Sequence, residues 1–168
     1  GFWYINGNVS FQTPDRGSLP CENMKIGLIQ NGNRYEPLSS VITDISGEGV
    51  FDFGSIYSSL DNLQILVYPQ NNEVVVYRYL SSGDYKKAEE YCYIYPQDGY
   101  LSCNHNLSIQ IEPWETAGAF ALCRMANQCA IALDNETASP PQIQGDFSRW
   151  KRWSAVREDS TLRIFWTQ

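Results

Sequence analysis

The sequence predicts a mainly β protein, an antiparallel β-sandwich with one buried helix and a C-terminal strand. Stretches of strand length alternate between apolar and polar residues, as in residues 107–111. Turn residues separate these stretches, and Asn31-Gly32-Asn33 is typical of a hairpin. A single long apolar stretch, at about residues 114–133, is suited to a helix.

The first half of the chain contains the strands expected to form the sandwich. The first strand covers residues 2–11 and has a kink at Asn6-Gly7. In the second strand, residues 24–30, alternation places Met24, Ile26 and Leu28 on one face. Further strands are expected at residues 40–44, 50–53, 63–68 and 73–80, the last two forming a hairpin.

Residues 43–53 are expected to form a turn between two strands. Gly47 and Gly49 supply positions at which φ can be positive, and Asp44 offers a side-chain acceptor to the turn backbone. Phe51 then begins an alternating strand with one buried face.

The order of a strand, a Pro20-led strand and the motif Thr43-Asp44-x-x-Gly47-x-Gly49-x-Phe51 resembles the transthyretin-like sandwich modules of secreted proteins, including carboxypeptidase regulatory-like and Cna-B-type repeats. The resemblance covers residues 5 to about 80. It implies a Greek-key sandwich without catalytic activity, used as a stalk, an adhesin or pilin unit, or an accessory domain beside an enzyme. Cna-B-like modules sometimes carry an isopeptide crosslink, and Lys25 falls near the lysine position. Alternation places Lys25 outside the core, so we expect no crosslink.

A polar break at residues 81–84 separates the sandwich, residues 1–82, from a second part, residues 83–168. The second part either packs on the sandwich or continues the same domain. Its expected elements are a hairpin of residues 91–95 and 100–103, a helix at about residues 114–133 and a closing strand marked by Leu162, Ile164 and Trp166. The helix is apolar on most faces, and we therefore expect it to be buried.

The charge balance argues against two classes of partner. The chain has 168 residues, with 12 Lys and Arg against 19 Asp and Glu, and a net charge of −7. Nucleic-acid binding requires clustered cations, and anionic lipid repels an acidic chain. Arg124, Asn127 and Gln128 interrupt the longest apolar stretch, residues 117–133. We therefore expect neither nucleic-acid binding nor membrane insertion.

Three N-x-S/T sequons, at Asn8, Asn106 and Asn135, and five cysteines without C-x-x-C spacing favour an oxidising, extracellular destination. Residues 1–5 contain no Met and no basic or apolar leader, as in a mature N-terminus or a trimmed chain. Asn135 falls in an expected exposed loop, residues 134–141. We predict an extracellular or cell-surface protein that carries N-linked glycans.

The cysteines allow several pairings. Cys92 and Cys103 lie almost equidistant from the turn between them, so a bridge across the expected hairpin is geometrically reasonable. Cys123 and Cys129 point apart on the expected helix, so we do not expect them to bridge each other. The pairing of Cys21 stays open. An odd cysteine fits either an intermolecular bridge or a free buried thiol.

The sequence lacks the common catalytic motifs. His105 is the one histidine, whereas a metallopeptidase requires several ligands at fixed spacing. Cys103 and His105 share a strand face, as a nucleophile and its base would, but the expected bridge to Cys92 competes for the thiol. No G-x-S-x-G, G-x-G-x-x-G or P-loop occurs, and adjacent acids such as Glu89-Glu90 are typical of a solvated face. We therefore predict neither catalysis nor a cofactor.

Two tryptophans form the sharpest candidate for a carbohydrate-binding surface. Trp150 and Trp153 lie in the cationic stretch of residues 149–153, where indole faces can stack on sugars. The alternative, which we favour, is that they anchor the C-terminal segment while the neighbouring cations extend outward.

Other aromatic stretches are candidates for subunit contacts. Tyr91, Tyr93 and Tyr95 share one face of a strand, as a cross-strand ladder or as an interface. The aromatic N-terminal strand either pairs within the monomer or is donated to the next subunit. Its interface candidates are Phe2, Trp3, Tyr4 and Ile5.

These observations favour a non-catalytic extracellular subunit with a structural or adhesive role. Its most concrete form is a glycosylated, pilus-like filament in which copies join by β-strand complementation. The alternative is a carbohydrate- or protein-binding accessory module of a secreted hydrolase. The expected partners are other copies of the chain and cell-surface glycans.

Overall fold

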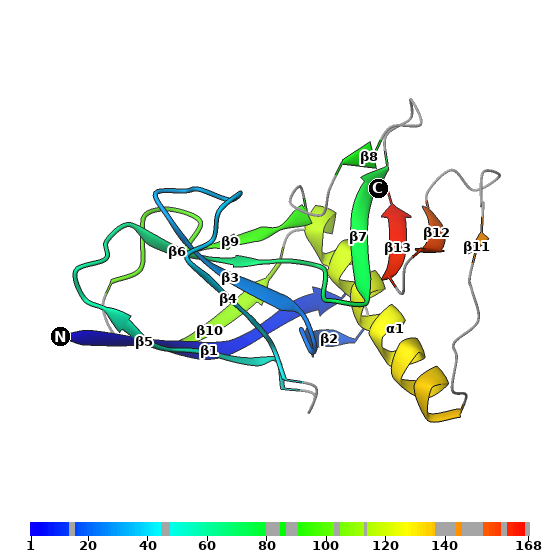
Figure 1. The fold of residues 1–168 in the computed structure, drawn as a ribbon, viewed down its shortest axis with the longest axis horizontal. Coiled ribbons are helices and arrows are strands. Elements are labelled where there is room, and N and C mark those ends of the chain that lie inside the picture. The colour runs from blue at the N-terminus through cyan, green and yellow to red at the C-terminus, as the bar shows by residue number, and fades with distance from the viewer. Residues whose placement is uncertain are drawn as a thin grey trace.

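The computed structural model describes residues 1–13, 16–44, 48–79, 85–86, 91–102, 105–112, 114–136, 144–145, 153–158 and 161–166. Within these residues, the structure comprises strands β1 to β13, which form three sheets, and one helix, α1 (Figure 1). The prediction of a mainly β fold with a single helix at about residues 114–133 is confirmed, since α1 covers Trp114–Glu136.

Sheet A is built around β1 (Phe2–Thr13). One edge of β1 pairs with β10 (His105–Ile111), and the other pairs first with β5 (Val50–Tyr57) and then with β2 (Gly17–Pro20). β10 runs parallel to β1, a departure from the expected all-antiparallel arrangement. A parallel neighbour requires a long crossover connection, and the strands of the second sheet provide it.

Glycine is required at two positions of sheet A. A Cβ atom on Gly7 would collide with the backbone of Leu107, so the close approach of β1 to β10 depends on the missing side chain. Gly49 has a φ of 67°, and a side chain there would collide with the Val9 carbonyl. The Val50 N–H donates to Asp44 Oδ1 at 2.8 Å, which confirms the predicted acceptor in this turn.

Sheet B has the order β4 (Ser39–Ile42), β3 (Lys25–Gln30), β6 (Leu63–Val67) and β9 (Tyr93–Tyr95), with antiparallel neighbours. The strands expected on either side of Asn31-Gly32-Asn33 do pair, β3 with β4, but the connection between them covers residues 31–38 rather than that turn alone. The prediction that residues 91–95 pair with residues 100–103 in a hairpin is wrong, because β9 pairs with β6 instead. β6 is buried along its whole length, so its backbone groups need partners on both edges.

Sheet C has the order β11 (Gln144–Gly145), β12 (Trp153–Glu158), β13 (Thr161–Trp166), β7 (Val74–Tyr79) and β8 (Tyr85–Lys86). The hairpin predicted from residues 63–68 and 73–80 is wrong, because β6 belongs to sheet B and β7 to sheet C. β7 instead runs parallel to the C-terminal strand β13, which supplies a longer ladder than the single bridge between Gln70 and Val75. The predicted closing strand is confirmed.

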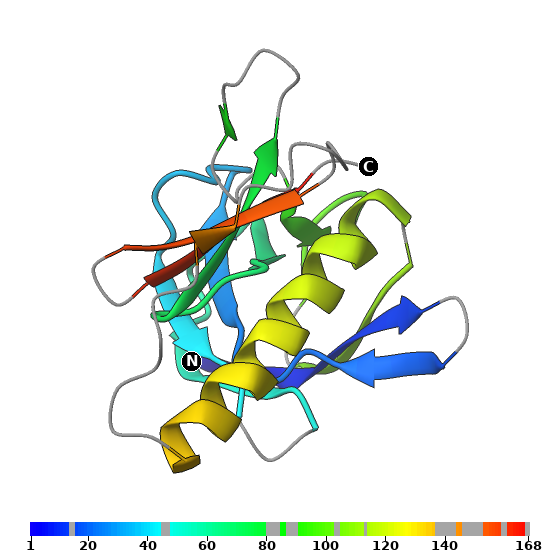
Figure 2. The same cartoon turned by 90° about the vertical axis from the view of Figure 1, so that its right-hand side faces the viewer.

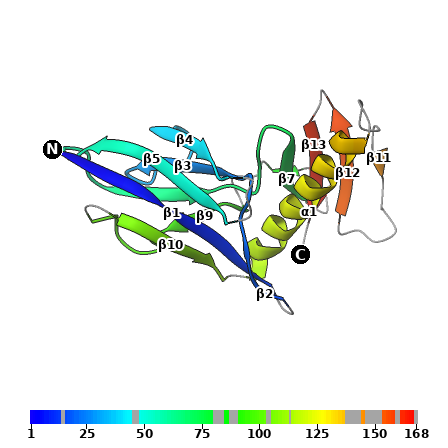
Figure 3. The same ribbon diagram turned by 90° about the horizontal axis from the view of Figure 1, so that it is seen from below.

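Helix α1 packs against β1 of sheet A and β7 of sheet C, at the end of the sandwich away from the N-terminus (Figures 1 and 3), and runs at a slant to the strands of sheet C (Figure 2). Its buried face carries Ala119, Phe120 and Cys123, whereas Met125 on the other side is 61% exposed. The helix is therefore buried on one face only. No helix in the described part of the chain is long and apolar enough to cross a membrane.

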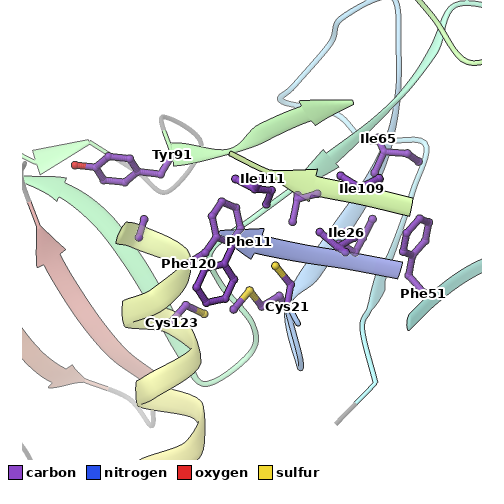
Figure 4. Close-up of a cluster of buried hydrophobic side chains, with 14 of the residues drawn as sticks. Phe11, Cys21, Ile26, Phe51, Ile65, Tyr91, Ile109, Ile111, Phe120 and Cys123 are labelled. Carbon is purple, nitrogen blue, oxygen red and sulfur yellow. The ribbon is translucent and has the colours of Figure 1, made fainter. Parts of the chain in front are cut away.

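One cluster of buried side chains connects both halves of the chain (Figure 4). It includes Phe11 of β1 and Phe51 of β5 together with Ile109 of β10, Phe120 of α1 and Ile164 of β13. Because β10 completes sheet A and β7 enters sheet C, residues from both sides of position 82 contribute to the same sheets.

Candidate binding surfaces

The outer edge of β4 is a candidate for strand pairing. Among the described strands, β4 pairs only with β3 (Figure 3). The Lys25 N–H donates to the Gln70 carbonyl at 2.8 Å, and the Lys25 carbonyl accepts from the Tyr68 N–H at 2.9 Å, so both backbone groups of Lys25 face β6. Ile42, directly opposite on β4, is therefore in a non-hydrogen-bonded pair with Lys25. By the same alternation, the backbone groups of Ser40 and Ile42 point away from β3, toward the sheet border.

Apolar side chains accompany this edge. Tyr35 is 86% exposed, Leu38 is 48% exposed and Ile42 is 40% exposed. Tyr35 and Leu38 belong to the loop between β3 and β4, and Ile42 belongs to the strand itself. Exposed apolar groups next to unpaired strand atoms are typical of a surface that another chain covers. The sequence predicted a strand here but not its edge position, because alternation does not reveal pairing partners.

A polar hollow of about 280 Å³ adjoins the same edge. It is lined by Lys25, Ser40, Val41, Ile42, Gln70, Asn71 and Asn72. Gly27, opposite Ser40, carries no side chain, and an added Cβ would lie 3.0 Å from the Tyr68 ring. The Lys25 Nζ stands 4.6 Å from the centroid of that ring. None of the residues that line the hollow is acidic, so its charge is positive.

By contrast, an ion pair and several hydrogen bonds connect α1 to the chain just before β3. The Arg124 Nη1 lies 2.8 Å from Glu22 Oε1 and also donates to the Pro20 carbonyl at 2.9 Å. The Asn127 side-chain amide donates to the carbonyls of Glu22 and Asn23, each at 3.3 Å. These bonds hold the helix against the β2–β3 connection, a structural role.

Asn71 links this junction to the hollow. Its side-chain amide donates to the carbonyl of Asn23 at 2.8 Å and to Asn127 Oδ1. Its Oδ1 accepts from the N–H groups of Glu73 and Val74, at 2.7 Å and 2.8 Å. With these bonds made, Asn71 serves as a rigid wall of the hollow.

The aromatic end of β1 lies at the N-terminal tip of the sandwich, far from sheet C (Figures 1 and 3). Phe2 and Tyr57 are 53% and 65% exposed, and their ring centroids lie 5.0 Å apart. Of the interface candidates, Phe2 and Tyr4 are exposed, Trp3 is half-buried and Ile5 is buried. Phe2, Trp3 and Tyr4 pair with β5 in the same chain, so the structure shows the monomer arrangement of this strand.

Two sequons lie together on the outer face of sheet A. Asn8 of β1 pairs with Ser108 of β10. Asn106 lies two residues before Ser108 on β10, so its side chain points to the same face of the sheet. Both asparagines are exposed. The third, Asn135, lies in the last turn of α1 rather than in the expected loop, because the helix continues to Glu136. Glycan attachment at these positions stays a prediction.

The cysteine side chains that the structure describes, those of Cys21, Cys92 and Cys123, are buried. Burial is the main cause that raises the pKa of Cys21 well above its usual value, with a smaller contribution from Cys123, while Arg124 lowers it. Burial raises the pKa of Cys123 to about 12, although a hydrogen bond from Asn127 opposes the shift. Both side chains lie in the same cluster (Figure 4), and neither has the low pKa of a nucleophilic cysteine. Cys92 is also buried. Cys103 and the side chain of Cys129 lie outside the described residues, so the Cys92–Cys103 bridge stays a prediction.

The tyrosines at positions 91, 93 and 95 face inward. Tyr91 is 6% exposed, and Tyr93 and Tyr95 are half-buried against the main core. Burial raises the pKa of Tyr93, with an opposing effect of its hydrogen bond to Gln97. These side chains therefore pack against the core, with Tyr93 and Tyr95 opposite Val67 and Ile65 of β6, and their role in a subunit contact stays a prediction.

The remaining sequence-based candidates fall where the structure describes no side chain. Trp150, Cys103 and the side chains of His105 and Trp153 lie outside the described residues. The carbohydrate-binding hypothesis for the tryptophans and the Cys103–His105 dyad therefore stay predictions. In the part of the chain that is described, no group of His, Cys, Asp and Glu side chains is arranged to hold a metal ion.

Comparisons with known proteins identify no relative. No protein-family model, curated protein or solved structure matches the chain.

Proposed function

We propose that this chain is a non-catalytic extracellular subunit with a structural or adhesive role, and that copies of it associate by β-strand pairing at β4. The observation that carries this proposal is the outer border of β4, where the backbone groups of Ser40 and Ile42 point away from the sheet. An extended segment of a second copy would satisfy these groups by β-augmentation.

Two features support a second copy as the occupant. Tyr35, Leu38 and Ile42 offer apolar area that a neighbouring strand would cover. The hollow beside them contains a lysine and no acid, whereas the chain as a whole carries a net charge of −7. An acidic copy is therefore complementary in charge to this surface.

Pairing of β4 with a different segment of the next copy does not close on itself and so builds a filament. The aromatic segment Phe2–Ile5 is one possible donor. Its donation has a cost, because Phe2, Trp3 and Tyr4 already pair with β5 and Ile5 is only 3% exposed. Assembly by donation of Phe2–Ile5 therefore requires the first residues of β1 to separate from β5.

The test is the variant Ile42→Lys, which places a charge on the proposed pairing edge. Charged side chains on edge strands prevent pairing, so we expect the association constant to fall by at least about tenfold. Sedimentation velocity and electron microscopy of the purified chain measure the change. Val50→Lys is the matched control, because Val50 of β5 is 41% exposed and Ile42 is 40% exposed.

The proposal fails if the unmodified chain remains monomeric at all accessible concentrations, or if Ile42→Lys assembles as the control does. If the unmodified chain forms dimers and no larger assemblies, β4 instead forms a two-fold symmetric contact and the filament is wrong. Ser40→Pro gives an independent check, because proline removes an outward N–H and is tolerated on edge strands.

A further inference from the structure

We infer that the hollow beside β4 is a carboxylate-binding subsite, which takes an Asp or Glu side chain of the strand that pairs with β4. The subsite therefore selects an acidic segment of a second copy rather than Phe2–Ile5, which contains no acid. The inference rests on the proposed pairing at β4 and adds to it the chemistry that selects the incoming segment. A strand edge alone binds any extended backbone, whereas a pocket for one side chain confers specificity.

The position of Lys25 fits this role. Lys25 lies opposite Ile42 in a non-hydrogen-bonded pair, in which side chains approach most closely. A strand added outside β4 would lie two strand spacings from β3, about 10 Å. Side chains directly opposite each other across a sheet point to the same face. A long acidic side chain opposite Ser40 or Ile42 would therefore extend toward the Lys25 ammonium.

The charge of the hollow selects an anion. Among the described residues Lys25 takes part in no ion pair, and its ammonium instead stands over the Tyr68 ring at 4.6 Å. Such a cation–π contact leaves the remaining N–H donors of the ammonium available. The hydroxyl of Ser40 and the side chains of Gln70 and Asn72 supply neutral polar groups around the same space.

The hollow is pre-organised on one side. Asn71 is 8% exposed and is fixed by hydrogen bonds to Asn23, Asn127, Glu73 and Val74. Gly27 leaves the space that the Tyr68 ring fills. Binding of a carboxylate therefore does not require these walls to be reordered, which lowers the cost of association.

The experiment uses two short capped peptides of alternating valine and threonine, one with a central glutamate and one with glutamine at that place. Each is titrated into the full chain at a concentration at which the chain is monomeric, and backbone amide shifts of Ser40 and Ile42 report edge pairing. We expect the glutamate peptide to bind about tenfold more tightly, because charge-assisted hydrogen bonds are stronger than neutral ones. Lys25→Met should remove this preference and leave binding of the glutamine peptide unchanged.

The two proposals fail in distinguishable ways. If both peptides shift the Ser40 and Ile42 amides with equal affinity, pairing at β4 stands and the carboxylate subsite is wrong. If the preference for glutamate survives in Lys25→Met, the assignment to this hollow is also wrong. If neither peptide shifts these amides, pairing at β4 is wrong and the subsite has no strand to select. Raising the salt concentration should weaken only the glutamate complex of the unmodified chain.

Discussion

Arg124 and Lys25 are cationic side chains in two contrasting regions of the molecule. The Arg124 guanidinium is largely buried and bonded to the protein, since it pairs with Glu22 at 2.8 Å and donates to the Pro20 carbonyl. Lys25 lies at the rim of a hollow beside the Tyr68 ring, and none of the described residues that line the hollow is acidic. The first cation holds a helix to a strand connection, whereas the second is the cation that we propose binds a carboxylate. The charge of a side chain by itself therefore does not indicate its function. The number of hydrogen-bond and ion-pair partners that it has within the protein is more informative.

The largest expected effect concerns the bonded region. Asn127→Leu removes a buried amide that bonds Asn71 and the carbonyls of Glu22 and Asn23. Since the Asn71 amide and the carbonyls of Glu22 and Asn23 each lose a hydrogen bond in a largely buried place, we expect the free energy of unfolding to fall by about 2 to 3 kcal/mol. Urea denaturation measures this loss. Met125→Leu, on the exposed side of the same helix, is the control and should change stability by less than about 0.5 kcal/mol.

The second prediction uses Cys123, which lies beside Asn127 in the bonded region. Its pKa is about 12 in the folded chain, well above that of an unfolded cysteine, about 8.5. The unfolded state therefore loses its proton first, and stability that is present below pH 8.5 decreases as pH rises toward 12. The expected slope is up to about 1.4 kcal/mol per pH unit from this thiol.

Urea denaturation from pH 8 to pH 10.5, compared between the unmodified chain and Cys123→Ala, isolates this contribution. The slope should be smaller in Cys123→Ala. Equal slopes in the two proteins would show that the thiol is solvated in the folded state.

The smallest expected effect on stability concerns the open region. Lys25→Met removes the cation but keeps a long side chain over Tyr68, so we expect a loss of at most about 1 kcal/mol, the strength of a cation–π contact. Thermal denaturation measures it. A loss as large as that in Asn127→Leu would place Lys25 in the structural framework and would remove the contrast between the two regions.

Much of the β architecture was predictable because its signal is local. Residues 107–111 alternate and form β10 with Leu107, Ile109 and Ile111 inward. Asp44 and Gly49 were predicted in the turn before β5, since a positive φ and a side-chain acceptor are properties of single residues. The helix was predicted from its length and composition, although its last turn at Asn135 was expected to be loop.

Pairing between strands was not predictable in the same way. Residues 63–68 and 73–80 were expected to pair as neighbours, but β6 and β7 belong to different sheets, and β7 lies parallel to the C-terminal strand. Alternation fixes which face of a strand is buried, and it contains no information on the partner at either edge.

The sequence by itself determined the mainly β character, the single helix and the acidic charge of this chain, because each depends on composition or on residues close in the sequence. Only the tertiary structure decided that β10 lies beside β1, that Asn71 meets Asn127, and that Lys25 borders a hollow next to an edge that no described strand covers. Those contacts join residues distant in the sequence, and they depend on how the whole set of apolar faces packs into one core. The proposed carboxylate subsite beside β4 therefore depends on contacts that only the tertiary structure reveals.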